Sequence, residues 1–147
     1  MADQGTFQSG DVLTAADLNA FTQVTIVRQN GLSVPNTTNT TPSFNIEDID
    51  VGNWHTGSSA YIIVPYDGIY LVTANARNLN GTTRGLCVIT VNGASLADQD
   101  TDGGNDHSVA VVAEMSASDN VTMFVWQQSG TTRSVDVRLS VQLVRRT

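Results

Sequence analysis

Residues Tyr61–Ala74, with the sequence YIIVPYDGIYLVTA, hold two apolar runs separated by Pro65-Tyr66-Asp67-Gly68. Proline presets φ at the first position of a turn, and glycine allows a positive φ, so this stretch predicts a strand, a tight turn and a second strand. We expect the strands over 60–65 and 68–77. The second run alternates with a period of two. Its small and apolar face would consist of Tyr70, Val72, Ala74 and Ala76.

The same pattern continues through the rest of the chain. Asn92-Gly93 is a strong hairpin signal, and the segment 134–144 alternates apolar and polar residues without interruption. Long polar loops are expected at 29–43 and 98–107. Turn signals separate short strands at regular intervals, so the fold class is all-β, an antiparallel jelly-roll β-sandwich. The remaining expected strands are 22–28, 44–51, 85–91, 94–97, 108–115 and 121–127.

The composition of the chain excludes several kinds of partner. The chain has 147 residues, which is the length of one domain, and a net charge of −7 with no lysine. Nucleic acids and anionic membranes require a basic surface, so neither is an expected partner. No apolar run is long enough to cross a membrane. The single cysteine, Cys87, lies in an apolar strand and is expected to be an inert buried thiol.

The N-terminal residues 1–21 differ from the strands that follow. Thr14 is a suitable N-cap, and Leu13 with Leu18 could form a hydrophobic staple, which predicts a short helix over 15–21. Such a short helix is marginal by itself and needs a surface to dock on. We therefore divide the chain into an arm with a short helix, residues 1–21, and a jelly-roll domain, residues 22–147.

No catalytic motif is found, so no enzyme activity and no cofactor are expected. Asp98-x-Asp100-x-Asp102-Gly103 begins like a calcium-binding loop, but the twelfth position is Val109 where a bidentate glutamate is needed. A solvated acidic loop is the favoured interpretation, and calcium binding stays the alternative. His55 and His107 have no metal-ligand spacing.

Several segments together resemble a known family. They are the Phe44 segment, Asn53-Trp54-His55-Thr56-Gly57, Pro65-Tyr66-Asp67-Gly68-Ile69-Tyr70, Val91-Asn92-Gly93, and the pair 121–126 and 135–144. Their order over 22–147 resembles the C1q/TNF-like jelly roll as used in bacteriophage virion proteins. The resemblance implies a homotrimer that packs one sheet of each subunit around a threefold axis. Tyr70, Phe124 and Trp126 are the candidate interface residues, with a place in the subunit's own core as the alternative.

Residues Ser9–Asn19 resemble the opening of many phage tail and head accessory proteins, which implies a segment that docks on the virion. Its candidate capsid-docking residues are Val12, Leu13, Leu18 and Phe21. The expected function is that of a trimeric capsid decoration or cement protein, assembled in the host cytoplasm and located in the virion. Its partner would be the major capsid protein or another virion protein. The alternative is a tail fibre or tail-tip protein that recognises a host surface glycan through the two long loops.

Overall fold

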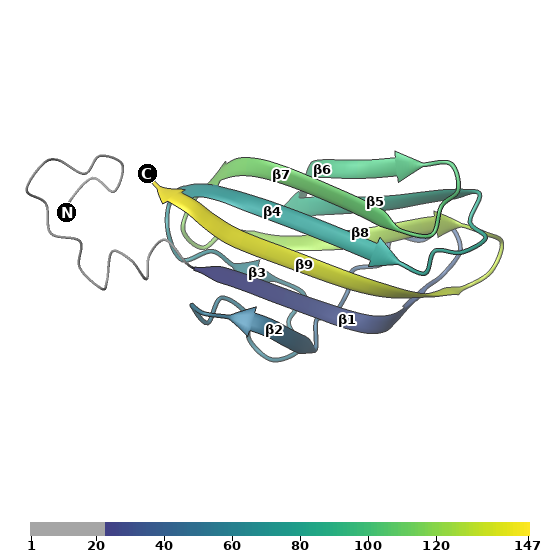
Figure 1. Ribbon diagram of the computed structural model, residues 1–147, viewed down its shortest axis with the longest axis horizontal. Coiled ribbons are helices and arrows are strands. Elements are labelled where there is room, and N and C mark those ends of the chain that lie inside the picture. Colours follow the sequence, from purple (N-terminus) through teal and green to yellow (C-terminus); the bar gives the residue numbers. More distant parts are fainter. Residues whose placement is uncertain (1–22) are drawn as a thin grey trace, which may run out of the picture.

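A computed structural model describes residues 23–147 and shows an antiparallel sandwich of two sheets (Figure 1). The five-stranded sheet has the order β2-β1-β9-β4-β7, and the four-stranded sheet has the order β3-β8-β5-β6. The predicted arm and helix, with Val12, Leu13, Leu18 and Phe21, lie outside the described residues. The strands are β1 (Val24–Val34), β2 (Ile46–Asp50), β3 (Ile62–Ile63), β4 (Gly68–Arg77), β5 (Arg84–Val91), β6 (Ala94–Thr101), β7 (His107–Met115), β8 (Asn120–Gln128) and β9 (Arg133–Arg146).

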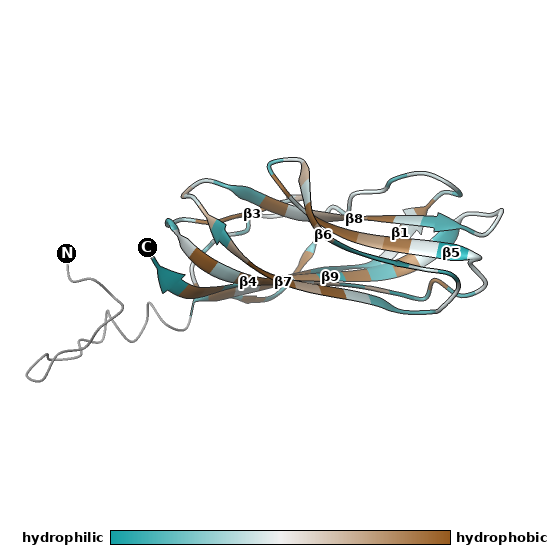
Figure 2. Ribbon diagram, turned by 90° about the horizontal axis from the view of Figure 1, so that it is seen from above, coloured by the Kyte–Doolittle hydropathy of each residue, from teal (hydrophilic) through white to brown (hydrophobic). Residues whose placement is uncertain are grey.

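The core lies between the two layers seen in Figure 2. The predicted faces are confirmed: Tyr70, Val72, Ala74 and Ala76 of β4 are fully buried, and the apolar positions of β9 from Val135 to Leu143 are buried too. Each strand pairs antiparallel with its neighbours, and alternate side chains therefore point inward and outward. Among residues 23–147, no helix has the length and apolar character needed to cross a membrane.

The turn that organises the fold differs from the prediction in one respect. Residues 64–67 connect β3 in one sheet to β4 in the other, and Gly68 is not among the glycines with positive φ. A Cβ at Gly68 would lie 2.5 Å from the carbonyl oxygen of Arg145. Glycine is required there because the backbones of β4 and β9 approach closely. β3 is also shorter than expected, with only Ile62 and Ile63 in ladder pairing.

The predicted bounds of the two long loops, 29–43 and 98–107, are wrong, because part of each segment belongs to a strand. β1 continues to Val34 through a bulge between Gln29 and Leu32, where Gly31 has a φ of 68°. The bulge restores the inward position of Leu32 and Val34. β6 continues to Thr101, so Asp98 and Asp100 lie in a strand paired with β5. In contrast, the hairpin at Asn92-Gly93 is confirmed, with φ of 51° and 81°.

Candidate interaction surfaces

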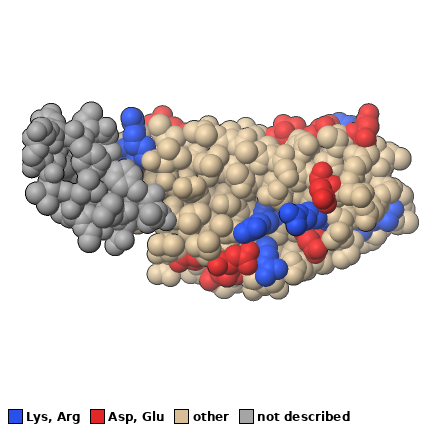
Figure 3. Space-filling view, in the orientation of Figure 1, with Lys and Arg blue, Asp and Glu red and all other residues tan. Residues whose placement is uncertain are grey.

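The outward face of the five-stranded sheet carries a broad uncharged area (Figure 3). Strand register places side chains in rows across it: Leu71 lies between Val112 and Gln142, and Thr73 lies between Ala110 and Ser140. Val112 is 62 % exposed. An area with exposed aliphatic side chains is a candidate interaction surface. We call this area the uncharged patch, which consists of Val24, Ile26, Leu71, Thr73, Ala110, Val112, Ser140 and Gln142.

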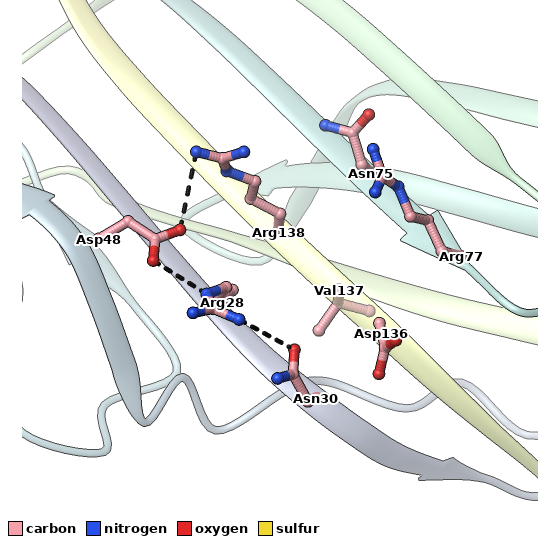
Figure 4. A pocket seen from close by; sticks show the side chains of 8 residues that line it. All are labelled: Arg28, Asn30, Asp48, Asn75, Arg77, Asp136, Val137 and Arg138. Carbon is pink, nitrogen blue, oxygen red and sulfur yellow. Dashed lines mark hydrogen bonds and ion pairs between the residues drawn. The ribbon is translucent and has the colours of Figure 1, made fainter.

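Charged side chains gather on another part of the same outward face of the five-stranded sheet. A hollow of about 650 Å³, the arginine hollow, is lined by Arg28, Asn30, Asp48, Asn75, Arg77, Asp136, Val137 and Arg138 (Figure 4). Three strands, β1, β4 and β9, bring the arginines together because their residues occupy neighbouring register positions. The amino-acid sequence alone does not predict this cluster. The alternation of each strand points these arginines outward, but only the pairing of the strands makes them neighbours.

Ion pairs neutralise part of the arginine hollow. Nε of Arg28 donates to Asp48 at 2.9 Å, and a guanidinium nitrogen of Arg138 lies 3.6 Å from the same carboxylate. Asp136 is used structurally, because it accepts hydrogen bonds from the Gly31 backbone N–H and the Asn78 side chain, both at 2.8 Å. Within residues 23–147, Arg77 forms no ion pair.

Phe124 and Trp126 lie on the outward face of the four-stranded sheet, both partly buried. Register places Trp126 beside Leu86 and Phe124 beside Val88. The guanidinium of Arg84 lies 5.9 Å from the centre of the Trp126 ring and also pairs with Asp100. The hydrogen bond from Arg84 lowers the pKa of Asp100 below its ordinary value. These two aromatic side chains thus stay available to a partner, on the layer opposite to the uncharged patch.

Tyr70 corrects one expectation about the interface. Its side chain is fully buried between the sheets, its hydroxyl donates to the carbonyl of Tyr66 at 2.8 Å, and its ring packs edge-to-face on Trp54. Burial raises the pKa of Tyr70 to about 12. A side chain without exposed surface cannot contact a second subunit. Tyr70 is therefore a core residue, as in the alternative stated above, because its alternating position faces the opposite sheet.

The acidic segment 98–107 does not form a calcium loop. Asp98 and Asp100 lie on β6 with their side chains outward, and Asp100 is paired with Arg84. In the described part of the chain, no three His, Cys, Asp or Glu side chains are grouped closely enough to hold a metal ion. Both ring nitrogens of His55 already have partners, with Nδ1 2.7 Å from Glu47 and Nε2 donating to the Ser59 carbonyl at 3.0 Å.

The two segments expected to form a glycan-binding face are only partly brought together. Asn36 accepts hydrogen bonds from the backbone N–H groups of Ser129 and Gly130, at the end of β8. Gly103 lies at the same end of the sandwich, because its N–H donates to Thr83, whose N–H in turn donates to Gln128. From Thr37 to Thr40, however, the chain runs alongside β8. This segment extends the sheet and does not form a separate loop.

Comparison with known proteins identifies the fold. No protein-family model matches the chain, and no curated protein matches it in sequence. The globular domain of zebrafish complement 1qA matches with a TM-score of 0.65 and 15% identity, over 85% of this chain and 99% of that one. PRD1 vertex protein P5 matches with a TM-score of 0.68 and 12% identity, over 85% of this chain and 99% of that one. Murine APRIL matches with a TM-score of 0.58 and 14% identity, over 82% of this chain and 100% of that one.

These matches show that residues 23–147 adopt a C1q/TNF-like jelly roll, as predicted from the sequence. Folds of this class are typically binding or structural domains rather than enzymes. One of the similar structures, PRD1 vertex protein P5, belongs to a phage virion. At these identities the similarity concerns the fold alone, so the role of this chain must be argued from its own surfaces.

Proposed function

We propose that this chain is a structural protein of a bacteriophage virion, a homotrimeric decoration or cement protein that binds the head shell and stabilises it. The observation that carries the proposal is the similarity to PRD1 vertex protein P5, which extends over 85% of this chain and 99% of that one. A decoration role is based on binding alone and requires no catalytic group.

The uncharged patch supports the trimer. It lies on the five-stranded sheet, where Val112 is 62 % exposed and Ile26 and Leu71 are partly exposed. A second copy of this chain would remove these aliphatic side chains from water, which is favourable in proportion to the apolar area buried. A closed ring of three subunits would also link three capsid contacts and gain avidity from them.

The oligomeric state can be measured by light scattering coupled to size-exclusion chromatography. The full chain is expected to have the mass of three subunits. Val112→Arg places a charge in the uncharged patch and should yield monomers. Ile63→Arg is the matched control, because Ile63 is a β-branched residue that is 48 % exposed on the other sheet. A monomeric full chain would refute the trimer.

Phe124 and Trp126 stay a prediction for the interface and are tested in the same way. If Trp126→Arg yields monomers while Val112→Arg remains trimeric, the subunits meet through the four-stranded sheet, and the assignment of the uncharged patch is wrong.

Docking through residues 1–21, with Val12, Leu13, Leu18 and Phe21, is part of the proposal. Deletion of these residues should leave a folded trimer that no longer co-sediments with capsids. Capsid binding at full strength by the truncated chain would contradict the docking role.

The position in the virion can be tested by gold labelling of intact particles with an antibody against this chain. Label distributed over the head is expected. Label confined to the tail or its tip would instead favour the second candidate, a receptor-binding protein, and would contradict the decoration role.

A further inference from the structure

A second hollow, of about 470 Å³, lies on the outward face of the four-stranded sheet, near the turn that joins β5 to β6. Its volume falls in the range of about 300–1,000 Å³ typical of ligand pockets. It is separate from the uncharged patch and from the arginine hollow, both of which belong to the other sheet. We call it the aromatic hollow, which is lined by Thr41, Tyr61, Thr90, Asn92, Gly93, Asn120, Thr122 and Phe124.

The floor of the aromatic hollow is held rigidly. Thr90 and Thr122 lie directly opposite each other on β5 and β8, and they are only 5% and 7% exposed. The hydroxyl of Thr122 donates to the carbonyl of Ala60. The Asn92 side chain donates to Asp119 at 2.7 Å and accepts from the Asn120 backbone N–H at 2.9 Å. A preformed site loses little conformational entropy when a ligand binds.

Two aromatic rings line the aromatic hollow above this floor. Tyr61 is 46 % exposed, and Phe124 is partly buried. Aromatic faces offer flat apolar surface, and such surface fits the C–H face of a sugar ring. The sequence does not reveal that these two residues line one hollow, since they are more than sixty positions apart. They are brought together because β3 pairs with β8.

The polar groups of the aromatic hollow are uncharged, and several are unused. Among the hydrogen bonds within residues 23–147, none involves the side chains of Thr41, Thr90 or Asn120, or the hydroxyl of Tyr61. No arginine, lysine, aspartate or glutamate lines the hollow. Hydroxyl and amide groups can exchange hydrogen bonds with sugar hydroxyls, whereas a charged ligand would find no opposite charge to offset its desolvation.

We propose that the aromatic hollow binds a neutral hexopyranose, as a residue of a glycan. Tyr61 and Phe124 contact the C–H faces of the sugar, while Thr41, Thr90 and Asn120 bond its hydroxyls. The inference holds whether the chain occupies the head or the tail of a virion. It rests on one part of the proposed function, the joining of subunits through the uncharged patch, because that arrangement leaves Phe124 outside the subunit interface. In a trimer the three hollows would act together on a multivalent glycan.

The test is saturation-transfer NMR on the full chain, followed by titration, with glucose, galactose, mannose and N-acetylglucosamine as separate probes. Glucuronate is the charged comparison. At least one neutral sugar should give transfer and bind more tightly than glucuronate. Tyr61→Ala and Phe124→Ala should weaken that binding about tenfold or more. Tyr61→Ala alters an exposed side chain, so it is informative even if Phe124→Ala does not fold.

Leu96→Ala is the control, because Leu96 is an exposed apolar residue on β6 of the same sheet but lies outside the aromatic hollow. It should leave the affinity within about twofold. The proposal is overturned if no neutral sugar gives transfer, if glucuronate binds as tightly as the neutral sugars do, or if Leu96→Ala weakens binding as much as Tyr61→Ala does.

Discussion

The imidazole of His107 lies against the backbone of Gly85, so close that a Cβ at Gly85 would be 2.5 Å from its Nε2 atom. His107 begins β7 in one sheet, and Gly85 belongs to β5 in the other. The ring is fully buried, and its Nδ1 atom lies 3.2 Å from the Thr101 hydroxyl. A glycine is needed at position 85 because the histidine occupies the space of a side chain.

Gly85→Ala should therefore destabilise the fold. The added methyl group overlaps the His107 ring, which has no exposed side to move into, and overpacking of this kind costs about 1–3 kcal/mol. Chemical denaturation of both proteins measures the difference. In the His107→Ala background the same change at Gly85 should cost much less, since the clash is gone. Equal costs in both backgrounds would show that the two residues do not interact.

His107 should also make the stability depend on pH. Burial lowers the pKa of His107, opposed by the nearby charges of Asp106 and Asp100. In the unfolded chain the imidazole takes up a proton near its ordinary pKa of about 6.5, whereas the folded chain resists protonation at that pH. The free energy of unfolding should thus fall as the pH drops below about 6.5, with no contribution from this group above pH 7. His107→Gln should reduce the loss of unfolding free energy between pH 7 and pH 5, as measured by denaturation at each pH. An unchanged loss would show that His107 is not its source.

Cys87 should react only when the chain unfolds. Its side chain is fully buried, and burial raises the pKa of the thiol to about 12, so almost no thiolate exists at pH 8. Ellman's reagent should label the native protein only as fast as the whole domain unfolds. It should label the denatured protein immediately. Because the chain has a single cysteine, the readout belongs to this position alone. Rapid labelling under native conditions would show that β5 opens locally.

Asp136→Ala should destabilise the protein by about 1–3 kcal/mol. The carboxylate holds the bulge of β1 through the Gly31 N–H and the loop after β4 through the Asn78 side chain, both at 2.8 Å. Asp98→Ala is the control, because Asp98 is exposed and has no side-chain hydrogen bond among the described residues. Thermal unfolding midpoints compare the two variants. Similar midpoints would mean that the Asp136 contacts contribute no net stability.

Most of the strands and the fold class follow from local patterns in the amino-acid sequence. The alternation over 134–144, the inward face of β4 and the Asn92-Gly93 turn are local patterns, and each depends on residues within a few positions. The two overextended loop predictions also have local causes. A bulge at Gly31 shifts the apolar alternation of β1 by one position, and the alternating aspartates of β6 are compatible with an edge strand as well as with a loop.

Local patterns do not predict which side chains share a surface, because that depends on which strands pair in the folded chain. Tyr70 faces the core and not a partner, because the sheet that covers it comes from strands distant in sequence. Arg28, Arg77 and Arg138 line one hollow because β1 and β4 both pair with β9. Tyr61 and Phe124 line another because β3 pairs with β8. The pairing of distant strands depends on the packing of the whole sandwich. A periodic pattern indicates which face of a strand points outward, but not which strand lies beside it.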